Sequence, residues 1–204
     1  MGRSTAAAGG RGRRPGGADT RGQILAVARD SFARKGFDRT TIRAVAADAS
    51  VDPALVHHYF GSKDDLFLAA LEIPIDPRDA IPAALAPGPD GAGERLLRTF
   101  LSVWDDPQAR LPLLALARSA LTTEAAADLL RSGMFRMIFQ PVAALLGSDD
   151  AWLRAQLVAS QLSGLVMTRY VLRLEPLASL PADEVVAWVA PNLQRYLSAA
   201  PPTG

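Results

Sequence analysis

TIRAVAADASVDPALVHHYF, residues 41–60, has the pattern of two short helices joined by a tight turn. Inward-facing residues, with a small one where the helices cross, recur at helical spacing: Val45, Ala46, Ala49, Val56 and Tyr59. Asp52 and Pro53 mark the second helix start, because an aspartate caps free backbone N–H groups and proline suits the first helical position. This pattern predicts a helix-turn-helix whose second helix, about 53–59, enters a DNA major groove.

A helix is predicted directly before this motif. Apolar residues recur at helical spacing over about 20–35, and Gly36 follows as a C-terminal stop. Phe37 is expected to fold back onto this helix. A threonine hydroxyl, from Thr40 or Thr41, then caps the first helix of the motif.

After the motif, a helix is expected to begin at Ser62 or Lys63 and to stop before Pro74. The proline-rich stretch 73–91 is expected to be a linker or irregular connection with a domain boundary, since long helices do not cross several prolines. Beyond it, apolar stripes predict helices over about 92–105, 108–121, 124–146, 150–174 and 182–198. The sequence has no alternating strand pattern, so an all-α fold is predicted.

Composition and charge restrict the class of protein. The chain has 204 residues and no cysteine, which excludes disulfides and thiolate metal sites and suits a reducing cytoplasm. Neither a membrane span nor a secretory signal is expected. Residues 1–63 carry 11 Lys and Arg against 5 Asp and Glu, whereas residues 64–204 carry 11 against 16. A basic first part fits polyanion binding, although ordinary variation in surface charge would give the same division.

Three elements over residues 20–71 resemble the tetracycline-repressor (TetR) family of transcriptional regulators. They are the run around Phe32, Gly36, Phe37 and Thr41, the helix-turn-helix, and the segment YFGSKDDL at 59–66. The segment SQLSGLVMTRYVLRLEPL, residues 160–177, is similar to one C-terminal subfamily.

The chain is expected to have three parts, the first from its Gly-, Ala- and Arg-rich composition and the other two from the resemblance. Residues 1–19 are expected to form a disordered basic arm, in which arginines such as Arg11, Arg13 and Arg14 contact DNA or only aid solubility. Residues 20–72 would form the DNA-binding three-helix head. Residues 73–204 would form a helical effector-binding and dimerisation domain.

Two positions depart from the family pattern. Ser50 stands where the family usually has glycine at the turn, and a non-glycine residue with positive φ costs about 1 kcal/mol. His57 stands where the family commonly has a tyrosine that contacts phosphate, although an imidazole can also donate a hydrogen bond.

The candidate DNA-contacting residues are Thr40, Thr41, Arg43, Pro53, Ala54, Leu55, His57, His58, Tyr59 and Lys63. Thr41, Arg43 and Lys63 suit phosphate contacts. Residues 53–55 lack side-chain donors and would contact thymine methyls, while the histidines would reach purine N7 atoms or simply face solvent. By resemblance Tyr59 faces phosphate, although its spacing equally makes it a core residue. With so few polar side chains available to the bases, part of the specificity is expected to come from DNA shape.

The last two predicted helices, about 150–174 and 182–198, are long and apolar, and Ala155 and Gly164 permit close approach. They are the candidates for a homodimer face, although the same stripes could serve only the monomer core. A dimer would present two recognition helices about one turn of DNA apart on an inverted repeat.

The resemblance also implies an apolar small-molecule effector held between helices. The candidate lining residues, each of which could equally be simple core, are Phe100, Trp104, Arg118, Met134, Phe135, Met137, Phe139, Gln161, Met167 and Tyr170. Arg118 and Arg169 lie in apolar helical contexts, where they could pair with an acidic ligand group or extend to water.

Enzymatic activity is the main rival function. The sequence has no G-x-S-x-G, P-loop, H-E-x-x-H or dinucleotide fingerprint, and no metal or cofactor is expected. Its two histidines both lie in the DNA motif, so catalysis would rest on carboxylates alone. The sequence therefore predicts a cytoplasmic, homodimeric, ligand-responsive DNA-binding regulator, most simply a repressor. The alternatives are an effector-independent DNA-binding protein, an activator, or a small all-helical enzyme.

Overall fold

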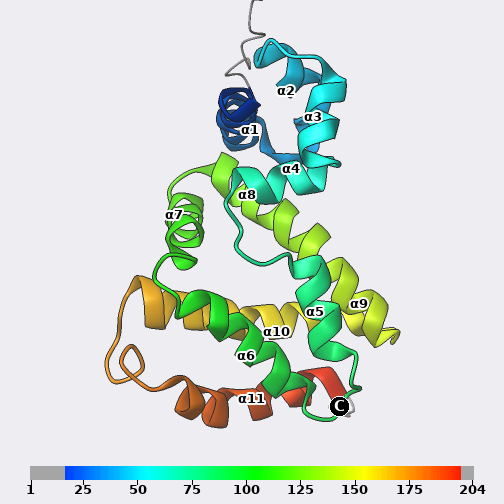
Figure 1. Ribbon diagram of the computed structural model, residues 1–204. Helices are drawn as coiled ribbons and strands as arrows, with labels where there is room; N and C mark the ends of the chain where they lie inside the picture. The colour runs from blue at the N-terminus through cyan, green and yellow to red at the C-terminus, as the bar shows by residue number, and fades with distance from the viewer. Residues whose placement is uncertain (1–16, 199–204) are drawn as a thin grey trace, which may run out of the picture.

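The computed structural model describes residues 17–198, and all of the regular secondary structure in this range is helical (Figure 1). The elements, in chain order, are α1 (Gly17–Arg39), α2 (Ile42–Asp48), α3 (Pro53–Phe60), α4 (Lys63–Ala70), α5 (Pro77–Leu85), α6 (Ala92–Trp104), α7 (Arg110–Ala120), α8 (Glu124–Met134), the π-helix η1 (Phe135–Phe139), α9 (Gln140–Leu146), α10 (Ala151–Leu165), the π-helix η2 (Val166–Val171) and α11 (Ala182–Ser198). The all-α prediction is confirmed. The arginines expected in the basic arm lie outside the described residues.

The first helix ends as its glycine predicts. Gly36 has φ 76° and ψ 174°, so regular helical geometry stops there although the helical segment is assigned to Arg39. Phe37 then folds back and is buried, with its ring stacked on Phe32 at a centroid distance of 5.8 Å. The helix begins at Gly17, a few residues before the predicted start.

The helix-turn-helix is packed as its spacing predicts. Val45, Ala46 and Val56 are completely buried, and these residues join the two helices in one core with α1 and α4. The turn between the helices contains Ser50 with φ 55°, which confirms that a non-glycine residue adopts a left-handed conformation there. The compact crossing of α2 and α3 is therefore kept at the cost of local backbone strain.

Short-range capping signals set the helix starts in this region. The Asp52 side chain accepts a hydrogen bond from the N–H of Ala54 at 2.7 Å, and Pro53 occupies the first turn of α3. Ser62 caps α4 through a capping box with Asp65, in which each side chain accepts from the other's backbone N–H.

The proline-rich stretch 73–91 is not entirely irregular, which corrects the linker prediction. It contains the nine-residue helix α5, which starts at Pro77 after the N-cap Asp76. Pro82 inside this helix removes one backbone donor. Burial of Ile81 and Ala84 against the neighbouring helices compensates for this loss, so tertiary packing outweighs local propensity.

Two of the longer predicted helices contain π-helical turns. Residues 124–146 form a continuous run through α8, η1 and α9, and residues 151–171 run through α10 and η2. The second run ends at Val171, three residues before the predicted end. Arg173, just beyond it, has φ 54°, a backbone conformation that an α-helix does not accommodate.

The run Glu124–Leu146 is long and apolar enough, by length and composition alone, to cross a membrane. It packs instead along α1 and α7 and supplies Leu129 and Met137 to the protein core. Its apolar character therefore serves the fold and does not indicate a membrane protein.

Figure 1 shows an N-terminal bundle of α1–α4 above a C-terminal bundle of α5–α11. The N-terminal core centres on α1–α4 but includes residues of α8 and η1. The C-terminal core joins α5, α6, α9, α10 and α11, with α6 packed closely along α11. Helix α8 connects the two bundles because it packs against α1 at one end and continues into the C-terminal bundle.

The close approach of α6 to α11 depends on Gly93. A Cβ atom at this position would lie 2.5 Å from the backbone N of Gln194 and 2.7 Å from the Ala190 oxygen. We expect Gly93→Ala to lower the free energy of unfolding by about 2 kcal/mol, because the added methyl group overpacks the contact between α6 and α11. Urea titrations measure this change. The matched control is Gly22→Ala in α1, where a Cβ meets nothing within 4 Å; this change should stabilise by about 0.5–1 kcal/mol. Equal effects of the two substitutions would contradict the packing argument.

Candidate nucleic-acid interface and internal cavity

The first turns of α3 present an exposed surface with little hydrogen-bonding capacity. Pro53 and Ala54 are exposed, and Leu55 is half-buried. His57 and His58 are exposed farther along the same helix. The arrangement offers apolar contacts near the start of the helix and imidazole nitrogens near its end, which is the order that the sequence predicts.

His57 also takes part in ending α3. Its Nδ1 lies 2.7 Å from the carbonyl oxygen of Gly61, which has φ 79° at the C-cap. Because a carbonyl oxygen only accepts hydrogen bonds, Nδ1 is the donor in this contact and Nε2 is the ring nitrogen left to face solvent or DNA. This bond fixes the orientation of an imidazole that sequence analysis places in either a phosphate or a base contact.

The two adjacent threonines have different roles, which corrects one prediction. Thr41 is exposed and caps α2 by accepting from the N–H of Ala44 at 3.1 Å, so its own hydroxyl proton remains available to a phosphate. Thr40 is buried, and its hydroxyl donates to backbone oxygens of Ser31 and Gly36. We therefore remove Thr40 from the candidate DNA contacts and assign it to the connection between α1 and α2.

The other candidate phosphate contacts differ in exposure. Arg43 is exposed on α2. Lys63 is half-buried: its Nζ donates to the backbone oxygen of Asp38 at 3.2 Å and lies 4.3 Å from the centre of the Phe37 ring. Burial lowers the pKa of the Lys63 ammonium. Tyr59 is half-buried against the N-terminal core, in keeping with the alternative interpretation of its spacing.

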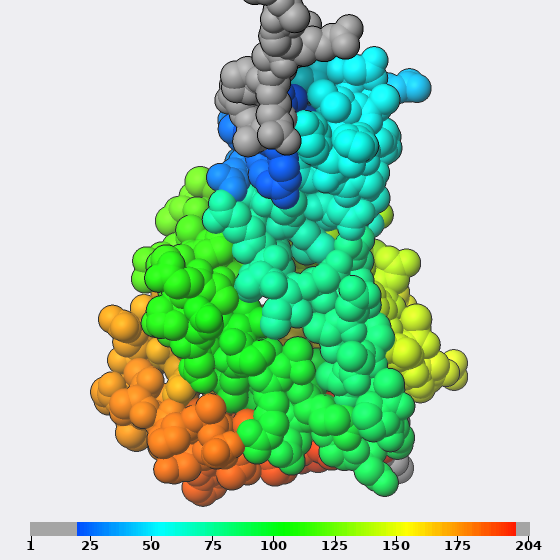
Figure 2. Space-filling model, viewed as in Figure 1, coloured from blue at the N-terminus to red at the C-terminus, as the bar shows by residue number. Residues whose placement is uncertain are grey.

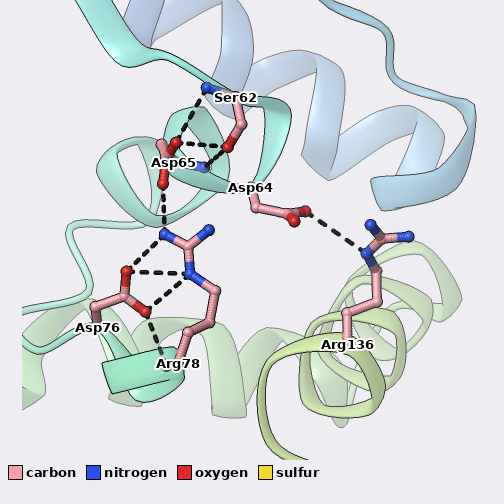
Figure 3. Close-up of polar contacts among 6 residues, drawn as sticks. All are labelled: Ser62, Asp64, Asp65, Asp76, Arg78 and Arg136. Atoms are coloured by element: carbon pink, nitrogen blue, oxygen red, sulfur yellow. Dashed lines mark hydrogen bonds and ion pairs between the residues drawn. The ribbon is translucent and has the colours of Figure 1, made fainter. Parts of the chain in front are cut away.

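An ion-pair cluster joins α4 to α5 at the boundary between the bundles (Figure 3). Arg78 of α5 donates to both oxygens of Asp76 and also reaches Asp65 of α4. Asp65 is at the same time the capping-box residue of α4, bonded to Ser62. One arginine therefore connects the N-terminal caps of two successive helices; we call Asp65, Asp76 and Arg78 the Arg78 cluster.

Hydrogen bonds from Arg78 hold the pKa of the Asp65 and Asp76 carboxyl groups below their ordinary value. The same bonds raise the pKa of the Arg78 guanidinium. Beside this cluster, Arg136 of η1 points toward Asp64 at 3.6 Å and lies over the Phe37 ring at 4.9 Å from its centre. Two polar contacts thus fasten α4 to the C-terminal bundle.

A cavity of about 400 Å³ lies between the N-terminal bundle and the C-terminal helices. Its walls come from α4, α5, α6, α7, α8, η1, α9, α10 and η2, together with the segment that joins α4 to α5. Among the described residues that line it, the polar side chains are those of Thr99 and Ser163, and none is charged. The size is that of a small-molecule site, and the lining suits an apolar occupant.

Half of the predicted lining residues lie on this wall. They are Phe100, Trp104, Met134, Met137 and Met167. The Phe100 and Trp104 rings stack at a centroid distance of 5.7 Å and form an aromatic part of the surface. These five residues come from three separate segments of the chain, which the tertiary fold brings together.

The other predicted lining residues lie elsewhere, and this corrects their assignment. Arg118 is exposed on α7, and Phe135 is half exposed, with its ring stacked on Trp152 at 5.1 Å. Phe139 packs in the C-terminal core, and Gln161 is half-buried outside the lining. The apolar face of a helix is broader than the part of it that lines the cavity. Nearby apolar residues of one helix can therefore face different surroundings.

Tyr170 and Arg169 lie behind the cavity wall and not on it. The Tyr170 hydroxyl donates to Asp105 at 2.9 Å, its ring lies 5.4 Å from that of Trp104, and burial raises its pKa. Arg169 is buried and bonds Asp105 as well as the carbonyl oxygens of Leu177 and Leu180. The arginine therefore holds the connection before α11, which excludes both pairing with an acidic ligand in this cavity and extension to water.

Sequence analysis missed the contribution of α4 and α5 to the cavity. Phe67 and Leu68 of α4 line it, as do Leu71 at the C-cap of α4 and Ile81 of α5. The apolar pattern of α4 was visible, but a pattern identifies a buried face without identifying what it faces.

The comparisons with known proteins agree with this architecture. Residues 24–70 match the family model described as bacterial regulatory proteins, tetR family. Residues 90–197, more than half of the chain, match the model of a tetracyclin repressor-like C-terminal domain. The chain belongs to the TetR family. It is therefore a helix-turn-helix transcription regulator and not an enzyme.

Individual relatives support the TetR assignment to different extents. The chain is similar over most of its length to the crystal structure of a TetR-family regulator from Streptomyces coelicolor A3, with 43% identity, 91% of this chain and 98% of that chain covered, and a TM-score of 0.52. It is 36% identical over 58 residues to the regulator HbdR of Aromatoleum sp. (strain CIB), which is 28% of this chain and 25% of HbdR. It is 38% identical over 72 residues to the regulator BetI of Brucella suis biovar 1, which is 33% of this chain and 36% of BetI. The matches to the two curated regulators thus span about a quarter and about a third of their lengths.

The Arg78 cluster predicts a pH-dependent contribution to the stability of this TetR regulator. Carboxyl groups whose pKa is lowered by folding stabilise the protein above their unfolded pKa, and this stabilisation is lost as the pH falls through the folded pKa. We expect Arg78→Met to lower the free energy of unfolding by about 1 kcal/mol near pH 7, because the cluster is partly solvent-exposed. The difference between wild type and variant should shrink below about pH 4, near the unfolded pKa of aspartate, in urea titrations at several pH values.

The control for this prediction is Arg34→Met, which removes an exposed ion pair with Asp30 within α1. Its effect should be smaller than that of Arg78→Met because both partners are well exposed. A difference between wild type and Arg78→Met that stays constant from pH 7 to pH 3 would show that the arginine acts through packing alone.

Proposed function

We propose that this TetR regulator is a cytoplasmic, homodimeric repressor that binds an inverted-repeat operator and is released by a small apolar effector. The observation that carries the proposal is the cavity, because its wall includes α4 of the N-terminal bundle as well as helices of the C-terminal bundle. An occupant therefore contacts both functional parts of the molecule. We further propose residues 20–72 as the DNA-binding domain and residues 73–204 as the effector-binding and dimerisation domain.

The DNA-binding mode follows from the exposed residues of α2 and α3. Thr41 and Arg43 would bind phosphates and position the bundle on the duplex. Residues 53–55 would contact base edges in the major groove by apolar contact, with His57 or His58 supplying polar contacts. Because the first turn of α3 presents few donors, DNA shape would contribute to specificity.

The dimer interface would form from the exposed faces of α10 and α11. Trp188 on α11 is 77% exposed and Leu153 on α10 is 59% exposed. Large apolar side chains exposed on two adjacent long helices mark an interaction surface. Pairing with a second copy would bury both faces in a four-helix interface with two-fold symmetry.

Effector release would operate through α4. Phe67, Leu68 and Leu71 line the cavity, and α4 is fastened to the C-terminal bundle by the Arg78 cluster. A ligand that binds one orientation of α4 better than another shifts the equilibrium between them. In a dimer, such a shift would change the separation of the two recognition helices and hence the affinity for the operator.

Selection of bound sequences from a random DNA pool tests the DNA-binding part of this proposal. We expect an inverted-repeat site from wild type. Leu55→Gln should change the base preference within each half-site, whereas Arg43→Ala should keep the preference, weaken binding to all sequences alike and reduce the salt dependence of log K by about 1. Recovery of unrelated sequences without symmetry would favour a non-specific DNA-binding protein.

Sedimentation velocity tests the proposed dimer face. Trp188→Glu should convert the protein from a dimer to a monomer, because a buried carboxylate without a partner opposes association. Leu111→Glu on α7, where the leucine is 56% exposed, is the matched control and should leave the dimer intact. A Trp188→Glu protein that still sediments as a dimer would place the interface elsewhere.

A further inference from the structure

The cavity lining lacks the groups that an ionic ligand needs. Its hydroxyl-bearing side chains are those of Thr99 and Ser163, and within residues 17–198 none of the side chains that line it carries a charge. An ionised ligand group buried there would lose its hydration without gaining a counter-ion. A hydroxyl or carbonyl group, by contrast, needs only one hydrogen-bonding partner such as a threonine or serine hydroxyl.

Two arginines that contact Trp104 or its neighbour Asp105 already have partners in the protein. Arg169 bonds Asp105 and two carbonyl oxygens, and Arg110 donates to the Trp104 oxygen at 3.3 Å and lies over the Tyr170 ring. Recruiting Arg169 to a ligand would leave Asp105 and the two carbonyl oxygens before α11 without their donor, and recruiting Arg110 would remove its contacts with Trp104 and the Tyr170 ring. These groups therefore stabilise the wall and do not supply a charge to its surface.

The lining is also unusually adaptable. The chain has four methionines, and all of those other than Met1, namely Met134, Met137 and Met167, line the cavity. Methionine side chains are flexible and polarisable, and they are used at surfaces that accept several partners. The two π-helical segments also face the cavity, η1 through Met137 and Ile138 and η2 through Val166 and Met167. Such turns occur often at functional sites.

The cavity also reaches the protein surface. Ile75, between α4 and α5, is 39% exposed, and Leu121, after α7, is 65% exposed, yet both line the cavity. Figure 2 shows narrow gaps between the teal chain that follows α4 and the green helices beside it. A ligand therefore has an apolar route from solvent to the cavity.

We propose that the cavity is a binding site for uncharged lipophilic molecules of more than one shape, and that it excludes organic anions and cations of the same size. This inference rests on the proposed function only in taking the cavity as the effector site. It names the chemical class of effector from the lining itself, and it replaces the sequence-based alternative of an acidic ligand paired with Arg118 or Arg169.

The test uses the full-length protein and a neutral fluorescent probe, N-phenyl-1-naphthylamine, whose emission rises in an apolar site. Three linear competitors with nine- or ten-carbon alkyl chains and different head groups would displace it at pH 7: 1-decanol, decanoate and decyltrimethylammonium. We expect decanol to displace the probe at a concentration at least about tenfold lower than either ion, because the ions lose hydration without compensation. Equal displacement by all three compounds, or tighter binding of either ion, would overturn the proposal.

Substitutions test whether the probe binds in the cavity. Ala117→Trp fills the cavity from α7 and should weaken probe binding at least about tenfold, whereas Ala115→Trp, on an exposed position of the same helix, should not. Met167→Lys supplies a counter-charge and should bring decanoate affinity up relative to decanol. Circular dichroism identifies any variant that fails to fold, and the wild-type competitor series decides the proposal without the variants. Probe binding that survives Ala117→Trp in a folded protein would overturn it.

Operator binding separates the two proposals. If decanol displaces the probe but leaves DNA affinity unchanged, the ligand class is supported and effector release from DNA fails. If no neutral compound binds while the protein still selects an inverted repeat, the ligand class fails and the DNA-binding function stands.

Discussion

The edge-on packing of Phe67 against the stacked rings of Phe32 and Phe37 is the contact on which the rest of the structure depends. Its ring lies 5.1 Å from both other rings, nearly perpendicular to each. The same ring approaches α8 so closely that a Cβ on Gly133 would lie 3.1 Å from it, and it lines the cavity. One side chain is therefore at once core of the DNA-binding bundle, contact to the C-terminal bundle and wall of the proposed effector site.

This shared position explains why the boundary between the bundles carries so many additional contacts. Aromatic packing by Phe67 fixes the distance between α4 and α8, but it resists rotation of α4 about the Phe67 ring only weakly. The Arg78 cluster and the Asp64–Arg136 contact lie to either side of α4 and supply directional bonds (Figure 3). Together they fasten α4 to the C-terminal bundle, so the proposed response to a ligand in the cavity would move α4 as a rigid element.

Each of the two bundles matches its own TetR-type family model. The curated regulators HbdR and BetI match short stretches that cover about a quarter and a third of this chain. The C-terminal part matches a TetR-type domain model, and the Streptomyces coelicolor regulator is similar across nearly the whole chain.

The sequence alone determined what depends on neighbours along the chain. Capping by Asp52, the stop at Gly36 and the buried Val45–Val56 crossing follow from the residue pattern of a short stretch of chain, and the structure agrees with each. The left-handed Ser50 was expected from the family pattern at the turn, and the structure agrees with it too. These local signals were sufficient for the all-α fold and for the surface that would meet DNA. They did not decide which of the adjacent residues Thr40 and Thr41 caps α2 and which is buried.

Tertiary structure decided which buried face meets which. Met134 and Phe135 are adjacent, yet one lines the cavity and the other stacks on Trp152 at the surface. Arg169 bonds carbonyl oxygens beyond the end of its own helix, and α5 forms in a proline-rich stretch because its partners bury it. Periodicity along a helix predicts that a side chain is buried. Its neighbours are set by the way helices that are distant in the sequence cross one another. The cavity and its uncharged lining result from those crossings.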